Sequence, residues 1–557
     1  MTAIAAARTV VIHAPRMTTS RASITPVVQT GTLTFARSAT VGVDSSVKLS
    51  DVSLEAATTR LTVHMSLAAG RQYSFAGGYT AGMKVTLTGP GTKATINLTK
   101  GFTVKTTGEY DLTFDAPYSL KNAGSVSSLS INSKAVLPTS SGDKNIDALL
   151  RGGTDGWWHA YDAAPATGTT QVSATAKGLA ANSSATALTY SFLSGQPQGQ
   201  NMSGFQPMTE AQKSAVRAAF DYYSKLINVT FTEAQDGSAG NINFGTNDQA
   251  HVSAGYASPP NGSAAKDETF LFLANDAATN GDAGVQTGGY GWETILHEIG
   301  HTLGLKHPGN YNAGGGGTPG PYLSATVDDR QHTIMSYKND AASTGVNPST
   351  AMVYDIEALQ YLYGANTSAS TATNGAFSFA DGNQYLQTLW SANGTDTIDL
   401  GALKNSSNVD LNGGAYSSIN ITGAADSAWY SGRNNVGIAY GSAINKVTLS
   451  SAEDVAESVT LNDAYANGAF DAINGFDAGD DTINIKKSMF KSVTAKNIEF
   501  GASATKATSK LVVNPTTGEV FYDADGSGTK SVARKIAQLN LVDGSAPLSL
   551  SNFSFVA

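Results

Sequence analysis

The sequence of 557 residues contains no cysteine, which excludes disulfides, thiolate catalysis and cysteine-ligated zinc. Any metal site must therefore use histidine, carboxylate, tyrosine or carbonyl ligands. Charged residues make up only 14% of the chain, against about 25% in an average soluble protein, and the formal net charge is −9. Such a chain has no basic field that would attract nucleic acid or an anionic membrane, so we expect neither partner.

Long apolar runs are also missing, since no stretch approaches the roughly 18 residues that a membrane-spanning helix requires. Residues 1–16 carry Arg8 inside their apolar stretch and no charged leader, which makes them a poor secretory signal. Glycine is abundant, with 58 residues, and serine and threonine are frequent. This composition is typical of a β-rich, loop-rich extracellular protein.

Three stretches with different residue patterns predict a multidomain protein. Residues 1–142 alternate β-favouring runs with glycine- and serine-rich turns, which predicts an N-terminal β-sandwich-like domain. Residues 143–366 mix helical and strand patterns and predict an α+β domain. Residues 367–557 return to short, regularly spaced strands and predict a C-terminal β-roll-like or β-sandwich-like domain. Full glycine-aspartate repeats are absent from this last stretch.

Two helices are expected in the α+β stretch. Thr209 and Gln212 form a capping-box pattern at the start of TEAQKSAVRAAFDYYSKL. The run YGWETILHEIGHTLGL, residues 290–305, predicts a second helix that is entered through a glycine-rich loop. Between them, INVTFTEA, NINFGT and ETFLFLAND read as strands, so the second helix follows directly on a sheet.

The segment HEIGHTLGLKH, residues 297–307, contains the candidate metal ligands and the candidate acid or base. His297 and His301 stand four residues apart on a helix, so both imidazoles lie on one face. Gly304 can adopt the left-handed conformation that ends a helix, after which His307 approaches the same point from outside it. Glu298 lies beside the first ligand and can reach a water on the metal. Three neutral imidazoles with an open position are typical of catalytic zinc.

Chance does not explain this pattern. In a chain of this length and composition, its five fixed positions would occur together by chance with a probability of roughly 10⁻⁵. About thirty residues further on, TIMSYKND places Met335 in a turn, and the two elements together form the metzincin signature. Met335 would form an apolar floor beneath the histidines, a role compatible with an ordinary core methionine. Asp328 and Asp329 precede this turn and are expected to be solvated loop residues.

The chain resembles the serralysin-type metalloproteases. The similar stretches are IDALLRGG, LTYSF, INVTFTEA, HEIGHTLGLKHPGNYNAG, TIMSYK and MVYDIEALQYLYGAN, with weaker similarity in LWSANGTDTIDL, NNVGIAYG and FYDADGSGTK. The resemblance implies a secreted zinc endopeptidase in which Glu298 is the general base for a metal-activated water. It also implies that Tyr337, two residues after Met335, is an additional zinc ligand that can swing away to stabilise the oxyanion.

The segment DADGSG, residues 523–528, begins like a calcium loop, but position twelve is Arg534 and not the glutamate of an EF-hand. Asp523 and Asp525 are therefore either part of a tight turn or ligands of a calcium site like those that the resemblance implies. Comparable calcium candidates are Asp396, Asp399, Asp480 and Asp481.

The resemblance also implies protein or peptide substrates and export by a type I secretion machine that reads a C-terminal address, with the apolar tail SLSNFSFVA as its candidate. We expect a monomer that is secreted and acts extracellularly or at the cell surface. The N-terminal domain can be inhibitory, targeting or an exosite. One alternative function belongs to another class: a cell-surface or adhesive binding protein that retains a protease fold.

Overall fold

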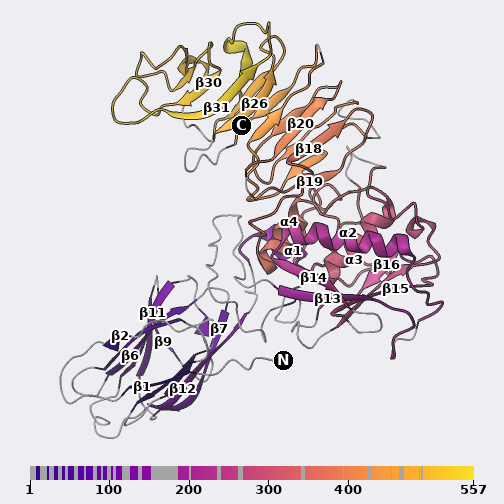
Figure 1. Ribbon diagram of the computed structural model, residues 1–557, viewed down its shortest axis with the longest axis vertical. Helices are drawn as coiled ribbons and strands as arrows, with labels where there is room; N and C mark the ends of the chain where they lie inside the picture. The colour runs from indigo at the N-terminus through magenta and orange to yellow at the C-terminus, as the bar shows by residue number, and fades with distance from the viewer. Residues whose placement is uncertain are drawn as a thin grey trace.

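Before residue 141, the computed structural model describes only the strands and residue 96. It also describes residues 141–556, with gaps at 152–157, 159–185, 200–201, 235–239, 261–267, 340–344, 393, 424–429, 453, 463–469, 489 and 491–492. Figure 1 shows three regions in chain order. Strands drawn in indigo and violet come first, the labelled helices gather in a central region, and strands in orange and yellow follow.

The N-terminal region contains two six-stranded sheets, with strand orders β1-β3-β4-β12-β7-β10 and β2-β5-β6-β11-β8-β9. Most neighbours are antiparallel, but β1 pairs with β3, and β12 with β4, in parallel. Tyr73 on β7 and Leu112 on β11 are fully buried. The strands are β1 Arg8–Ile12, β2 Ala22–Ser23, β3 Gly31–Phe35, β4 Thr40–Val43, β5 Lys48–Leu54, β6 Arg60–Leu67, β7 Arg71–Tyr79, β8 Lys84–Gly89, β9 Thr92–Thr95, β10 Phe102–Thr103, β11 Gly108–Asp115 and β12 Val126–Ala135.

The central region combines a five-stranded sheet, in the order β14-β13-β15-β17-β16, with four helices among its described residues. All neighbours are parallel except β16, which lies antiparallel to β17 at one edge. The helices are α1 Lys144–Leu149, α2 Glu210–Leu226, α3 Tyr290–Thr302 and α4 Val353–Tyr363, and the strands are β13 Thr186–Phe192, β14 Val229–Glu233, β15 Ile242–Asn247, β16 Gly255–Ala257 and β17 Thr269–Ala274. The α+β prediction is confirmed.

Helix α2 begins as predicted, because the Thr209 hydroxyl accepts from the Gln212 backbone N–H and the Gln212 side chain accepts from the Thr209 N–H. Its apolar face packs into a core shared with the sheet and with α3 and α4. The hydroxyl of Tyr223 on α2 donates to the backbone carbonyl of Leu296 on α3, at 2.8 Å. This bond fixes the helix that carries two of the predicted metal ligands.

The C-terminal region is built mainly from parallel strands, with antiparallel pairs β22–β23, β29–β30 and β30–β31, and it lies beyond α4 in Figure 1. One sheet has the order β18-β20-β24-β26-β31-β30-β29-β28, a second β21-β25-β27-β32 and a third β19-β23-β22. The strands are β18 Ala376–Ala380, β19 Gln387–Leu389, β20 Thr397–Ala402, β21 Asn408–Asp410, β22 Tyr416–Ser417, β23 Val436–Ile438, β24 Lys446–Thr448, β25 Ser458–Thr460, β26 Asp471–Phe476, β27 Thr482–Lys486, β28 Ile498–Phe500, β29 Leu511–Val513, β30 Glu519–Tyr522, β31 Arg534–Leu541 and β32 Phe553–Val556.

This region also packs against the central one. Leu386 and Trp390 belong to the same buried core as α4. The backbone carbonyl of Leu386 accepts from the Ser349 N–H at 2.9 Å, and the Thr350 hydroxyl accepts from the Thr388 N–H at 2.8 Å. None of the helices among the described residues combines the length and apolarity that crossing a membrane requires.

Candidate metal centre and catalytic pocket

Helix α3 carries the first two predicted ligands on one face. Its opposite face is apolar and fully buried, with Ile295, Leu296 and Ile299 in the central core. The helix stops at Thr302, and Gly304 then takes a φ of +107°, a left-handed conformation that favours glycine. The predicted reversal of the chain is therefore confirmed.

The turn after α3 brings His307 back to the first two histidines. The Nε2 atom of His307 lies 3.2 Å from Nε2 of His297 and 3.2 Å from Nε2 of His301. Among the residues that the structure describes, these three form the one group of acidic, histidine or cysteine side chains that is close enough to hold a metal ion. Neutral imidazoles arranged in this way match the donor set of a catalytic zinc site.

Each imidazole is oriented by a partner on its other nitrogen. The Nδ1 atom of His297 lies 2.7 Å from the carbonyl oxygen of Ile334, and that of His301 lies 2.9 Å from the carbonyl oxygen of Leu305. A carbonyl can only accept, so each Nδ1 carries the proton and each Nε2 has a free lone pair for a metal. Nδ1 of His307 is held in the same way by the side-chain oxygen of Asn312, at 2.8 Å.

Burial keeps the three imidazoles neutral. Desolvation, assisted by the neighbouring His307, lowers the pKa of His297 to about 3. Burial is also the main cause that lowers the pKa values of His301 and His307. A neutral ring is the form that binds zinc, so the site does not need to lose protons at neutral pH before it can accept the metal.

The turn that contains Met335 lies directly beneath α3. Met335 is fully buried, and its sulfur is 3.1 Å from the place that a Cβ on Gly300 would occupy. Glycine at that position thus permits the close approach. The turn is anchored by buried Asp355, whose carboxylate accepts from the Thr333 hydroxyl at 2.5 Å and from the Ile334 N–H at 2.8 Å. That Met335 forms the floor beneath the histidines stays a prediction.

Glu298 is buried beside the three imidazoles, and its Oε2 has no hydrogen-bond partner among the described residues. Burial raises the pKa of this carboxyl to about 8. A divalent cation nearby would favour the charged carboxylate and lower that pKa again. A side chain with this character beside a metal site is a candidate acid or base.

Tyr337 stands at the mouth of the site and is half exposed. The centre of its ring lies 4.6 Å from that of His307 and 6.0 Å from that of His297. Burial, followed by the charge of Glu298, raises the pKa of the phenol to about 12, so Tyr337 stays protonated and can donate a hydrogen bond.

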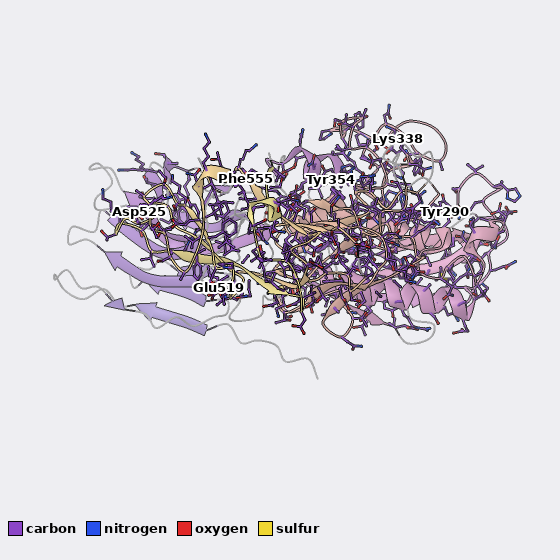
Figure 2. All side chains as sticks on the ribbon, turned by 90° about the horizontal axis from the view of Figure 1, so that it is seen from above. Tyr290, Lys338, Tyr354, Glu519, Asp525 and Phe555 are labelled. Carbon is purple, nitrogen blue, oxygen red and sulfur yellow. The ribbon has the colours of Figure 1, made fainter. Side chains whose placement is uncertain are left out.

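Of these groups, His297, Glu298 and Tyr337 line one pocket of about 440 Å³. Its wall includes the edge strand β16 and the first turn of α3. Arg330 and Glu293 form an ion pair in this wall, with the guanidinium Nε 2.7 Å from a carboxylate oxygen. Tyr290, which also lines the pocket, is labelled on the right-hand side of Figure 2.

Several supporting residues were missed by the sequence reading. Asn312 orients the third histidine, and Asp355 anchors the methionine turn. The indole N–H of fully buried Trp158 donates to the carbonyl of Thr302 at the end of α3, at 2.6 Å. Asn312 and Asp355 lie in stretches that resemble serralysins, but no spacing rule assigns a supporting role to these residues or to Trp158.

The expectation that Asp328 is a solvated loop residue was wrong. Its side chain is buried and accepts from the Tyr311 hydroxyl at 2.6 Å, the Ser336 hydroxyl at 2.8 Å and the Lys338 ammonium at 2.5 Å. Burial alone would raise the pKa of Asp328, but these hydrogen bonds outweigh it and hold the pKa below its ordinary value. Asp328 thereby fastens the loop after the third ligand to the methionine turn.

The predicted calcium residues lie in the C-terminal region, and Figure 2 shows Asp525 at the opposite end of the view from Tyr290. The carboxylate of Asp525 accepts from the backbone N–H groups of Lys530 at 2.8 Å and Ser531 at 3.0 Å. Asp523 is buried, and its carboxylate accepts from the Asp525 N–H at 3.2 Å. These contacts describe a closed turn, and calcium binding by Asp523 and Asp525 stays a prediction.

Comparison with known proteins agrees with this geometry. Residues 102–347 match the sequence model Reprolysin_5 of metallo-peptidase family M12. The chain is 32% identical over 288 residues to a serralysin of Photorhabdus sp. (strain Az29), covering 48% of this chain and 57% of the relative. It is 33% identical over 259 residues to the metallopeptidase AprA of Pseudomonas marginalis, covering 42% and 54%, and 33% identical over 262 residues to a serralysin of Proteus mirabilis, covering 42% and 53%.

The three histidines and the methionine turn are the elements of the metzincin signature, and residues 102–347 match a metallo-peptidase model. More particularly, the matched region is similar to the serralysins of Photorhabdus and Proteus. The matched region spans about half the length of these relatives, from 53% to 57%.

Proposed function

We propose that this chain is a zinc-dependent endopeptidase that hydrolyses peptide bonds in protein substrates. One observation carries the proposal: a single pocket of about 440 Å³ brings His297, the unpartnered carboxylate of Glu298 and the phenol of Tyr337 together. The similarity to serralysins supports the same reaction.

His297, His301 and His307 would hold the zinc ion. When bound, zinc supplies a Lewis acid that polarises the scissile carbonyl and lowers the pKa of a water molecule. Glu298 accepts the proton of the attacking water and later delivers it to the leaving amine. The phenol of Tyr337 donates a hydrogen bond to the carbonyl oxygen as negative charge develops there. Tyr337 is also proposed as a further ligand of the resting metal.

The adhesive alternative is less well supported. A binding protein that merely retained a protease fold would have no need for three clustered histidines beside a buried glutamate and a tyrosine. A chelator separates the two functions, because removing zinc abolishes hydrolysis but leaves adhesion through the β-rich regions unchanged.

The test uses the purified full-length chain, loaded with zinc, and denatured casein as the substrate. We expect phenanthroline to abolish cleavage and added zinc to restore it. Glu298→Gln should retain zinc but lose activity by about 10²- to 10⁴-fold. Glu210→Gln, the same change at an exposed position of α2, is the matched control with wild-type activity. Cleavage that resists the chelator, or Glu298→Gln at the wild-type rate, would overturn the proposal.

We further propose three domains, over residues 1–142, 143–366 and 367–557. The division is supported by the sheets, since none of the described sheets takes strands from two of these ranges. Export from the cell through type I secretion and calcium binding in the last range are proposed from the resemblance to serralysins. Protease activity in the medium of producing cells, with and without a type I transporter, tests the export.

A further inference from the structure

A buried lysine stands directly before the third metal ligand. Lys306 is only 7% exposed. Its ammonium lies 2.5 Å from the carbonyl oxygen of Ala148, 2.9 Å from that of Pro321 and 3.4 Å from that of His307. These oxygens belong to α1, to the loop that follows the ligand and to the ligand itself. One side chain thus joins three separate parts of the chain next to the metal site.

The backbone on either side of Lys306 is attached to the same helix end. The Lys306 N–H donates to the carbonyl of Leu149 at 2.7 Å, and the Arg151 N–H donates to the carbonyl of Gly304 at 3.2 Å. Leu150 forms a β-bridge with Leu305. The turn between the second and third ligands is therefore bound along its length to residues 144–151.

Burying an ammonium group costs free energy unless hydrogen bonds replace its water. A methionine of similar length would fill the same space at a lower desolvation cost. The three carbonyl contacts fix the positions of the segments that contribute them, which an apolar side chain cannot do. The polar contacts therefore point to a role in geometry.

We propose that Lys306 is a positioning residue for the metal centre, whose ammonium ties α1 and the loop containing Pro321 to the turn that carries His307. These contacts hold the His307 imidazole so that its Nε2 atom lies close to the Nε2 atoms of His297 and His301. The inference rests on the proposed zinc site. It assigns residues 144–151 to the structural support of that site.

The charge of Lys306 has a second effect on zinc affinity, opposite to that of its positioning role. A positive charge near a bound dication repels it, so removal of the charge alone would tighten zinc binding. Loss of positioning would weaken zinc binding, because groups that orient a metal ligand contribute roughly 10- to 100-fold to metal affinity. The direction of the change therefore distinguishes the two effects.

The test replaces Lys306 with methionine in the full-length chain and measures zinc affinity by competition with a chromophoric chelator. We expect Lys306→Met to weaken zinc binding by about 10- to 100-fold. The visible absorption of the cobalt-substituted protein should change as well, because it reports the ligand geometry. Lys213→Met, a change at a more exposed lysine paired with Glu210 on α2, is the control and should leave both readouts unchanged.

Lys306→Gln provides a second variant, because its amide retains donors for part of the carbonyl set and should give an intermediate affinity. Thermal unfolding of the zinc-free variants shows that each is folded. Unchanged or tighter zinc binding in either folded variant overturns the inference. If the wild-type chain binds zinc but cleaves no protein, the proposed function fails. The inference about Lys306 is then still decided by the zinc affinities of the variants and the wild type.

Discussion

The catalytic and C-terminal regions each contain a glutamate with a buried carboxylate oxygen that has no hydrogen-bond partner among the described residues. Glu298 is such a residue in the catalytic region, and Glu457 is one in the C-terminal region. Burial raises the pKa of each to about 8. Their surroundings differ. Glu298 lines a pocket beside three convergent imidazoles. Glu457 instead lies beside another acid, Asp481, whose carboxylate accepts from the Glu457 backbone N–H at 3.0 Å.

This difference indicates that a buried carboxylate with one unpartnered oxygen does not mark a catalytic site by itself. In the catalytic region, the neighbouring groups supply a place for a cation and an opening for a substrate. In the C-terminal region, burial and then the charge of Asp481 raise the pKa of Glu457, and this arrangement favours its protonated form. The first arrangement suits proton transfer, and the second makes stability depend on pH.

After the loss expected for Glu298→Gln, the next largest effect on activity is expected at the mouth of the catalytic pocket. Tyr337→Phe retains the ring that packs near His307 but removes the hydroxyl. We expect kcat to fall by about 10²- to 10³-fold, because the developing negative charge loses one donor, while zinc content is unchanged. Tyr385→Phe, which removes a hydroxyl in the C-terminal region, is the control for kcat. Retention of wild-type kcat in Tyr337→Phe would show that the phenol takes no part in the reaction.

A smaller effect is expected where a buried carboxylate is fully partnered. Asp355 accepts hydrogen bonds from Thr333, Ile334 and Met352. Asp355→Asn replaces one acceptor oxygen with a donor that faces other donors, so we expect the free energy of unfolding to fall by about 1–3 kcal/mol.

Denaturant unfolding of the zinc-free protein measures the effect of Asp355→Asn. The control is Asp221→Asn, which changes an exposed acid on α2 that pairs with Lys225. Zinc affinity should also weaken, since Ile334 supplies the carbonyl that orients His297. Equal stabilities of Asp355→Asn and wild type would show that this carboxylate does not anchor the turn.

The contrast between the regions also explains what the sequence could predict. The ligand geometry follows from local rules: a four-residue spacing on a helix, then a glycine that reverses the chain. The capping box at Thr209 is equally local and set the start of α2 correctly. The supporting contacts are not local, since Trp158 reaches Thr302 from 144 positions away. Such partners are selected by tertiary packing, for which one sequence contains no spacing rule.

The C-terminal sheets show the same limit. Short strands were predicted from alternating patterns, but whether they pair in parallel depends on connections and register across the whole region. For example, β26 pairs in parallel with β31, more than fifty residues later in the chain. Helix α1, over Lys144–Leu149, was also missed because six residues are too short for a clear helical period.

The last prediction concerns the C-terminal carboxylate itself. Glu457 has a pKa of about 8 in the folded chain and about 4.5 when unfolded. A raised pKa means that its contribution to stability is complete below about pH 4.5 and is lost as the pH rises through about 8. Glu457→Gln stays neutral throughout. We therefore expect the variant to exceed wild type in stability by an amount that grows from pH 5 to pH 9 and reaches a few kcal/mol.

Denaturant unfolding in EDTA at several pH values measures this difference without a contribution from divalent cations. The hydrogen bond from the Ser450 N–H to Glu457 can be kept by the amide oxygen of glutamine, so packing changes little. A difference in stability that is constant with pH would show that Glu457 is not the titrating group. Glu457→Gln should retain full protease activity, whereas Glu298→Gln should not. Loss of activity in both variants would show that the two carboxylates are not separate in function.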